Sequence, residues 1–351
     1  MADQDVRFSI ENGWGTITLA RPKALNSLTS EMCVAMDTQL RTWADDPSVK
    51  AVLIKGEGER AFCAGGDIRW LATTAKESPT EAATFFRKEY KLNNLIAHYP
   101  KPYVALVHGV CMGGGVGVSA MADRRIMTRG TTWAMPECGI GLIPDVGATY
   151  VLSQMPGGLG LFLSLTGDRL KGRDCLEAGL ATHVIEDDAY TDVYDALLRT
   201  PLDTDPLAAI DSALEPFAQR DPGRIAIIRE DVDRLFGEAS SVVLLQERLK
   251  AEGGAFGQKA LEQMAPGSPT SMALTLRLLN EAPSTFSECI AREFCVTAHL
   301  MEGPDFLEGV RAQIIDKDRD PKWQPAQLDA VDEARIDWYF TEPEGGPLAL
   351  E

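Results

Sequence analysis

The sequence predicts an α/β fold, in which a core of buried strands alternates with helices and a mainly helical portion follows. Residues 50–56 and 102–109 (KAVLIKG and PYVALVHG) are nearly continuous apolar runs, as is typical of strands that are buried on both faces. Helical periodicity fills the segments between the strand candidates, which indicates strand–helix alternation. Strand patterns end near residue 187, and helix-start signals recur after it.

The strand candidates begin with a predicted hairpin. VRFSI at 6–10 and GTITL at 15–19 flank a turn at residues 11–14 that contains Asn and Gly. Two shorter candidates follow the long apolar runs, namely RRIMT at 124–128 and THVIE at 182–186. We expect these segments to form the sheet of the core.

The predicted helices carry apolar residues on one face. One begins near Thr29 and repeats its apolar residues at Met32, Met36, Leu40 and Trp43, and another covers about 80–97. In the later part, Asp221-Pro222 and Ser268-Pro269 predict helix starts, because Pro suits the first helical position. We therefore divide the chain into a core at 1–195 and a helical portion at 196–351, which packs on the core or on a neighbouring subunit.

Composition restricts the function classes. The 351 residues are 45% hydrophobic and 25% charged, as in globular proteins, and the net charge of −18 argues against a nucleic-acid partner. No apolar run reaches the roughly 18–20 residues of a membrane span, and no targeting segment is visible, so we expect a cytoplasmic protein without a membrane partner. Seven cysteines without a C-x-x-C pair and four scattered histidines favour neither a disulfide framework nor a metal site.

Two glycine-rich turns are the first functional signal. GVCMGGGVG at 109–117 and AFCAGGD at 61–67 each follow a strand-like run and precede a helix-like segment. The spacing fits neither common nucleotide-binding template, since there is no G-x-x-x-x-G-K-[ST] and position 118 is Val. Two such turns at the ends of neighbouring strands can direct two backbone N–H groups toward one point and form an oxyanion hole. Tight turns with close helix packing are the alternative explanation.

These turns belong to a wider resemblance. AFCAGGD, HGVCMGGGVG and MPECGIGLIPDVG resemble the crotonase (enoyl-CoA hydratase/isomerase) superfamily, and the resemblance extends from RPKALNSL at 21–28 to DFLEGVRAQIIDKDRDPKW at 305–323. It implies a (ββα)n spiral core that binds an acyl-CoA thioester. It also assigns the oxyanion hole to the N–H groups of Gly66 and Gly114.

The carboxylates select the branch of the superfamily. A hydratase would carry Glu at 117 and at 137, whereas this chain has Gly117 and retains only Glu137. With Glu89 and Asp145, the pattern is similar to the 3-hydroxyisobutyryl-CoA hydrolase branch, which acts in valine breakdown. This resemblance implies that Glu89, Gly114, Glu137 and Asp145 contact the substrate. Glu137 is then the general base or the nucleophile, and Asp145 orients the water or the substrate hydroxyl, or tunes Glu137. Without the resemblance, Glu137 would be a surface carboxylate in a loop, Asp145 a helix cap and Glu89 a solvated helix residue.

The resemblance also implies the contacts of the CoA moiety. They are Ala24, Ala64, Asp67 and Ile68, with Lys23 as a phosphate partner and Arg69 as a weaker candidate. CoA is part of the substrate, so no cofactor and no metal is expected. The expected partner is the acyl-CoA, and the protein is a monomer or a homo-oligomer, either trimer or hexamer.

Other residues near these motifs have simpler explanations. Cys63, Cys111 and Cys138 are expected to be small buried hydrophobes, and His108 a packed residue. Two further functions stay open at this stage, an enoyl-CoA hydratase or isomerase of the same superfamily and a non-catalytic acyl-CoA-binding protein.

Overall fold

The structure, a computed structural model, describes residues 5–350, and these form two compact units. Unit 1 consists of residues 5–66, 91–133 and 170–226, and unit 2 consists of residues 67–90, 134–169 and 227–350. Each unit combines segments from several parts of the chain, and the division of the sequence at residue 195 stays a prediction.

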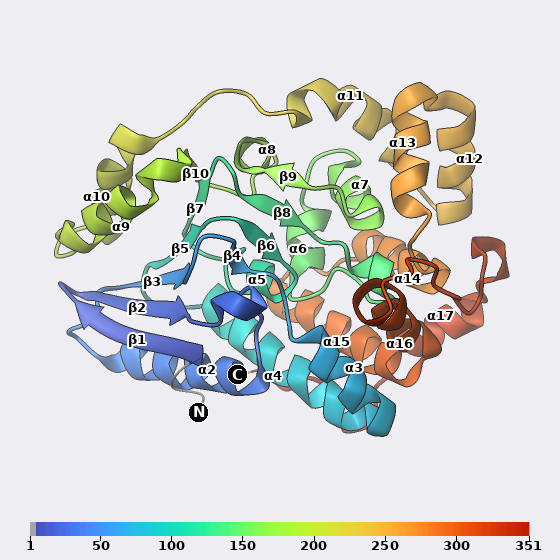
Figure 1. The fold of residues 1–351 in the computed structure, drawn as a ribbon, viewed down its shortest axis with the longest axis horizontal. Coiled ribbons are helices and arrows are strands. Elements are labelled where there is room, and N and C mark those ends of the chain that lie inside the picture. The colour runs from blue at the N-terminus through green and yellow to red at the C-terminus, as the bar shows by residue number, and fades with distance from the viewer. Residues whose placement is uncertain (1–4, 351) are drawn as a thin grey trace. The chain divides into compact units, whose positions relative to one another are not determined.

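Unit 1 is built on a six-stranded sheet in which every predicted strand is present. The strands lie in the order β1-β2-β3-β5-β7-β10 (Figure 1), with β1 and β2 antiparallel and all other neighbours parallel. The predicted hairpin is confirmed, because its turn at Asn12-Gly13 has both residues in the left-handed region. The bounds are β1 Val6–Glu11, β2 Trp14–Leu19, β3 Ala51–Gly56, β5 Tyr103–Val107, β7 Arg124–Thr128 and β10 His183–Ile185.

Helices cover both faces of this sheet, which explains why β3 and β5 are nearly continuously apolar. One face carries Trp14 and Leu53 and packs against α9 (Tyr190–Arg199) and α10 (Pro206–Leu214). Against the other face lies α2 (Ser30–Asp45), which begins where it was predicted to and is capped by Thr29. Gly15 is required there, because a Cβ would lie 2.8 Å from the Trp43 ring.

A second, four-stranded sheet in the order β4-β6-β8-β9 was not predicted. Its strands have only two or three residues, too few for a periodic pattern: β4 Ala61–Cys63, β6 Val110–Met112, β8 Thr132–Ala134 and β9 Leu170–Lys171. The two glycine turns follow β4 and β6, and a single helical turn, α5 (Gly114–Gly117), follows the second of them. The remaining helices of unit 1 are α8 Gly172–Glu177, η1 Pro22–Ala24, η3 Asp187–Ala189 and η4 Glu215–Phe217.

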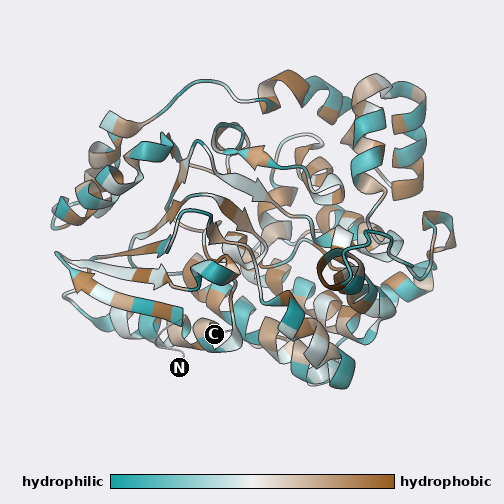
Figure 2. Ribbon diagram, viewed as in Figure 1, coloured by the Kyte–Doolittle hydropathy of each residue, from teal (hydrophilic) through white to brown (hydrophobic). Residues whose placement is uncertain are grey.

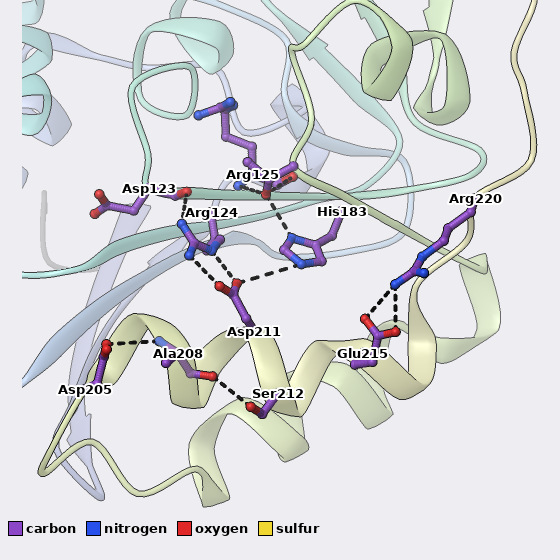
Figure 3. Close-up of polar contacts among 11 residues, drawn as sticks. Asp123, Arg124, Arg125, His183, Asp205, Ala208, Asp211, Ser212, Glu215 and Arg220 are labelled. Atoms are coloured by element: carbon purple, nitrogen blue, oxygen red, sulfur yellow. Dashed lines mark hydrogen bonds and ion pairs between the residues drawn. The ribbon is translucent and has the colours of Figure 1, made fainter.

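Ion pairs fasten α10 to the sheet. The Arg124 guanidinium of β7 donates two hydrogen bonds to the Asp211 carboxylate of α10, one of them at 2.6 Å, and His183 lies 3.9 Å from the same carboxylate (Figure 3). Arg125 instead donates to the backbone carbonyls of Leu180 and Ala122. We call Arg124, Asp211 and His183 the β7–α10 ion cluster.

Unit 2 is helical in its larger part. Helices such as α12 and α13 show alternating hydrophilic and hydrophobic bands, as expected of helices with one buried face (Figure 2). The helices are α3 Ile68–Glu77, α6 Ala148–Ser153, α7 Leu159–Thr166, α12 Val242–Glu252, α13 Gly254–Met264, α14 Pro269–Asn280, α15 Phe286–Glu302, α16 Pro304–Val310, α17 Glu333–Tyr339, η2 Glu137–Ile140, η5 Arg311–Ile315 and η6 Leu328–Ala330. Two further helices, α4 (Pro79–Ala97) and α11 (Ile225–Phe236), contribute residues to both units.

Of the two helix starts predicted from Pro, one is confirmed. Ser268 caps α14 and Pro269 is its first residue. The start at Asp221-Pro222 is wrong, because α11 begins only at Ile225 and the Asp221 carboxylate pairs with Arg173 instead of capping a helix. Within residues 5–350, no helix is long and apolar enough to cross a bilayer, and no three His, Cys, Asp or Glu side chains are grouped to hold a metal ion.

Candidate active site

The two glycine turns of unit 1 lie next to each other. Strands β4 and β6 are parallel neighbours with Cys63 opposite Cys111, so their carboxyl ends meet at one edge of the sheet. Gly65 (φ +110°) and Gly113 (φ +50°) need the conformational freedom of glycine. A Cβ on Gly65 would lie 3.8 Å from the Gly114 nitrogen, and a Cβ on Gly115 only 2.3 Å from the Cys63 carbonyl oxygen. A side chain at Gly115 would therefore push the two turns apart.

The amides predicted to form the oxyanion hole come from these turns. Gly114 is the first residue of α5, so its N–H has no acceptor within the helix. The turn, loop and cap hydrogen bonds between backbone groups of residues 5–350 include none donated by Gly66 or Gly114. Both N–H groups are therefore left for another acceptor.

The segment 21–28 is fastened to the first glycine turn. Leu28 N–H donates to the Gly65 carbonyl at 2.8 Å, and Ala64 N–H donates to the Leu25 carbonyl at 3.0 Å. This pairing brings the predicted CoA contacts Ala24 and Ala64 into one region, with Lys23 exposed beside them. The sequence analysis missed Asn26, which is fully buried in the left-handed region and donates to the carbonyls of Glu57 and Ala61. Its side chain holds this segment in place.

Three predicted carboxylates gather in unit 2. Glu89 lies on α4, Glu137 opens η2, and Asp145 lies in the loop before α6. All three are buried, with 2%, 6% and 5% of the residue exposed. The structure therefore corrects the simpler explanations: Glu89 is not solvated, Glu137 is not a surface carboxylate, and the N-cap of α6 is Gly147 and not Asp145.

Asp145 is held by a tyrosine that the sequence analysis missed. The Tyr90 hydroxyl donates to Asp145 Oδ2 at 2.6 Å and lies 3.0 Å from Thr297 Oγ1 of α15. Burial raises the pKa of Tyr90 well above its ordinary value, so the phenol keeps its proton and donates it. The position of Tyr90, directly after Glu89, was the only available signal in the sequence.

Burial raises the pKa of all three acids, and the charge of Asp145 raises the pKa of the other two further. Burial, followed by the charge of Asp145, raises the pKa of Glu89 and of Glu137 well above the ordinary carboxyl value. Burial also raises the pKa of Asp145, to about 6, although the hydrogen bond from Tyr90 opposes the shift. Asp145 is therefore the acid of the three that ionises first, while Glu137 has the basicity of a proton acceptor.

Two carboxyl oxygens of this group are buried without a partner. Glu137 Oε2 and Glu89 Oε1 make no hydrogen bond with any described residue. A buried polar atom without a partner is destabilising by about 1–3 kcal/mol. Such atoms mark places where a ligand or a water completes the hydrogen bonding.

A fourth buried acid, Glu293 of α15, was also missed. Its carboxylate accepts hydrogen bonds from the backbone N–H groups of Gly147 (2.6 Å) and Thr149 (2.9 Å) and from the Thr149 hydroxyl. Burial raises the pKa of Glu293 to about 8. The available signal was an acid on the apolar face of a helix, four positions from Cys289 and Thr297.

The remaining predicted residues lie as follows. Asp67 caps α3 by accepting from Trp70 N–H, Ile68 is the first residue of that helix, and the Arg69 guanidinium donates to the Ile314 carbonyl at 2.7 Å. Arg69 therefore has a structural partner in unit 2.

The thiols and His108 are packing residues, as predicted. Cys63, Cys111 and Cys138 are buried, and burial raises the pKa of Cys111 and Cys138 to about 12. A thiol with such a pKa is not ionised at neutral pH. The His108 ring lies 2.7 Å from the Gly58 carbonyl and packs edge-on against Tyr190.

Known proteins resemble the chain over nearly its whole length. Residues 14–340 match the enoyl-CoA hydratase/isomerase family. The mitochondrial 3-hydroxyisobutyryl-CoA hydrolase of Danio rerio is 44% identical over 99% of this chain and 92% of its own length. The human enzyme of that name is 42% identical over 97% of this chain and 89% of its own length.

Solved structures agree on the fold and carry different names. A carnitinyl-CoA dehydratase from Mycobacterium thermoresistibile superposes with a TM-score of 0.92 at 38% identity, covering 99% of both chains. An enoyl-CoA hydratase from Rhodobacter sphaeroides gives a TM-score of 0.90 at 36% identity, covering 99% of this chain and all of the other. The predicted crotonase fold and superfamily are thereby confirmed: the chain belongs to the enoyl-CoA hydratase/isomerase family.

Proposed function

We propose that the protein is a 3-hydroxyisobutyryl-CoA hydrolase, which cleaves this thioester to 3-hydroxyisobutyrate and CoA in valine breakdown. Full-length similarity to vertebrate enzymes of that name supports the proposal. The structural observation that carries it is Glu137, a buried acid with raised pKa and one carboxyl oxygen that has no partner among the described residues. Hydrolysis needs a basic oxygen of this kind, and Glu137 supplies it.

In the proposed reaction, Glu137 first accepts a proton and later returns it. The thioester oxygen accepts hydrogen bonds from Gly66 and Gly114 as negative charge develops on it. Glu137 removes a proton from the attacking water, whose oxygen bonds to the carbonyl carbon. The carbon–sulfur bond then breaks, and the CoA thiolate takes the proton from Glu137. Direct attack by Glu137, giving a transient anhydride that water opens, uses the same oxygen.

The other two acids hold the reactants. Asp145, oriented by Tyr90, keeps its negative charge near Glu137 and thereby keeps that acid basic. The partnerless Oε1 of Glu89 is a hydrogen-bonding group for the hydroxyl of the substrate's acyl chain. Ala24, Ala64, Asp67, Ile68 and Lys23 remain the proposed contacts of CoA, which is part of the substrate and not a cofactor. The cytoplasmic location and the oligomeric state stay predictions.

A second candidate is hydration or isomerisation of an enoyl-CoA, because the two superposed structures carry hydratase and dehydratase names. Gly117 argues against a hydratase of the two-glutamate type. It is buried in α5 and offers no carboxylate at the position where the resemblance requires one.

One assay distinguishes the two candidates. The purified protein is incubated with 3-hydroxyisobutyryl-CoA, saturated short-chain acyl-CoA and crotonyl-CoA, while a thiol reagent reports free CoA. We expect thiol release that is fastest with 3-hydroxyisobutyryl-CoA, and no loss of the conjugated absorbance of crotonyl-CoA. Loss of that absorbance without thiol release would establish the second candidate, and binding without either change would indicate a non-catalytic acyl-CoA-binding protein.

A further inference from the structure

The loop that carries Asp145 has an unfavourable backbone conformation. Val146 has φ +57° and Gly147 has φ +84°, so two consecutive residues lie in the left-handed region. Glycine adopts this region freely, whereas a β-branched residue such as valine is an outlier there. Contacts from elsewhere in unit 2 must hold Val146 in this conformation, because the residue would otherwise relax to negative φ and move its neighbour Asp145.

Glu293 makes the contacts that oppose this relaxation. Its Oε2 accepts from Gly147 N–H at 2.6 Å, directly after Val146, and its Oε1 accepts from Thr149 N–H at 2.9 Å and from the Thr149 hydroxyl. The side chain is fully buried, and no cation pairs with it among residues 5–350. The donors of these hydrogen bonds, Gly147 and Thr149, both lie within four residues after Asp145.

The same helix holds Asp145 from a second side. Thr297, one turn after Glu293 on α15, lies 3.0 Å from the Tyr90 hydroxyl that donates to Asp145. The first residue of α15, Phe286, packs so closely on Gly147 that a Cβ there would lie 2.1 Å from the ring. Helix α15 thus fixes both the backbone before α6 and the side chain of Asp145.

We propose that Glu293 is a positioning residue of the thioester hydrolase, which holds Val146 in the left-handed conformation and thereby places the Asp145 carboxylate for catalysis. The inference rests on the proposed function, because it assigns Asp145 a part in the reaction. Glu293 thereby belongs to the catalytic arrangement although it lies 148 positions after Asp145 in the sequence.

The test replaces the carboxylate by an amide of the same shape. In E293Q the amide group cannot accept from both N–H groups, so the loop loses a hydrogen bond and Val146 can relax. We expect kcat with 3-hydroxyisobutyryl-CoA to fall about 10- to 100-fold, while KM and the affinity for a non-hydrolysable acyl-CoA analogue change less than about threefold. The matched control is E302Q, the same change at an exposed position of α15, which should retain the wild-type kcat.

A rescue variant distinguishes positioning from general stability. Glycine at 146 removes the steric penalty of the left-handed region, so V146G in the E293Q background should recover most of the lost kcat, although it removes a buried side chain. A double variant no more active than E293Q, or an E293Q kcat equal to wild type, would overturn the proposal. If E293Q fails to fold, T149V removes the hydroxyl that donates to Glu293 and leaves both N–H bonds in place, and its kcat should fall about three- to tenfold; an unchanged kcat would overturn the proposal equally.

Amide hydrogen exchange separates this inference from the proposed function. Exchange at Gly147 or at Thr149 should accelerate in E293Q, because the Gln amide has one acceptor oxygen for the two N–H groups. If wild-type protein releases no thiol, the proposed function fails, whatever the exchange shows. If wild type is active and exchange accelerates without loss of kcat, the positioning role alone is wrong.

Discussion

The pKa values of buried or partly buried carboxylates are shifted in opposite directions in the two units. In the β7–α10 ion cluster of unit 1, Asp211 accepts two hydrogen bonds from Arg124 (Figure 3), and these bonds, together with the charges of Arg124 and His183, lower its pKa. In unit 2, Glu137 and Glu89 are more deeply buried, and on one oxygen each has neither a cation nor a hydrogen bond from any residue of 5–350. Their pKa values rise instead.

The direction of the pKa shift distinguishes carboxylates that stabilise the fold from carboxylates that take part in a reaction. A paired carboxylate stays ionised at every physiological pH, and its proton affinity is too low for acid–base chemistry. A buried acid without a counter-ion is destabilising for the fold, and natural proteins retain such groups mainly where they act on a substrate. The comparison therefore predicts that the same isosteric change has opposite consequences in the two units.

The largest expected effect is on catalysis. E137Q removes the basic oxygen and should lower kcat for thioester cleavage by about 10²–10⁴-fold, the usual contribution of an acid–base group. D211N makes the equivalent change in the β7–α10 ion cluster and should leave kcat within about twofold. Free-thiol release measures both variants.

The stability of the same two variants provides the control. E137Q should unfold at a temperature equal to or above that of wild type, because it removes the ionisable group that burial disfavours. An E137Q protein that cleaves the thioester at the wild-type rate would end the assignment of Glu137, and a D211N protein that is inactive but folded would end the distinction between the units.

The second effect concerns the backbone of unit 1. G115A places a Cβ 2.3 Å from the Cys63 carbonyl oxygen, so the two glycine turns must move apart. Loss of one oxyanion donor lowers kcat by about 10²–10³-fold, and we expect a decrease of that order with 3-hydroxyisobutyryl-CoA. G303A is the matched control, since a Cβ there meets only ordinary contacts at 3.5 Å. A G115A enzyme with wild-type kcat would contradict the role of these turns.

Much of this arrangement could be predicted from the sequence, because its signals are local. The continuous apolar runs of β3 and β5 identify strands buried on both faces, and the glycine turns and the Glu137 and Asp145 motifs are short and contiguous. The pairing of β4 with β6 could not be predicted, since strands of three residues carry no periodic pattern. The sequence shows two glycine turns, whereas only the structure shows that they are neighbours.

The residues that were missed act over long sequence separations. Tyr90 and Glu293 reach the Asp145 loop from α4 and α15, and no local pattern connects these segments. A buried glutamate on the apolar face of a helix is a usable signal, but it names neither the partner nor the role. Asp221 shows the reverse error, because a local cap signal at Asp221-Pro222 was overridden by pairing with Arg173.

The third effect is on pH dependence. Glu137 must be ionised to accept a proton, and its pKa lies above that of Asp145, which is about 6, so kcat should already fall as the pH decreases toward 6. The groups that face or charge Asp145 are Tyr90, Glu89, Glu137 and Glu293. D145N removes the charge that raises the pKa of Glu137, so it should lower kcat and move this acid limb to lower pH. A limb that stays at the same pH in D145N would assign it to another group.

The raised pKa of Asp145 also makes the stability of the fold depend on pH. The folded-state pKa of Asp145 lies above its ordinary value of 3.8, so the folded protein binds the proton more tightly than the unfolded chain does. The resulting stabilisation is complete below about pH 3.8 and is lost as the pH rises through 6. Between pH 4 and 7, the free energy of unfolding of wild type should therefore fall relative to D145N by up to about 3 kcal/mol, as urea denaturation can measure.

The smallest effect is the contribution of the β7–α10 ion cluster to stability. The side chains of Arg124 and Asp211 are 22% and 44% exposed, so water and salt screen their attraction. D211N should lower the free energy of unfolding by only about 0.2–1 kcal/mol in dilute buffer. The difference should shrink further in 1 M NaCl, where the Debye length is about 3 Å.

The salt dependence decides what this pair does. A screened ion pair loses its contribution in high salt, whereas a hydrogen bond that fixes α10 on β7 retains it. If the difference between wild type and D211N persists in 1 M NaCl, geometry and not charge makes Asp211 stabilising, and the R124M variant should then show the same salt-independent loss. In either case kcat should not change. Arg124 and Asp211 already satisfy each other's hydrogen bonding, so neither is left to bind a substrate.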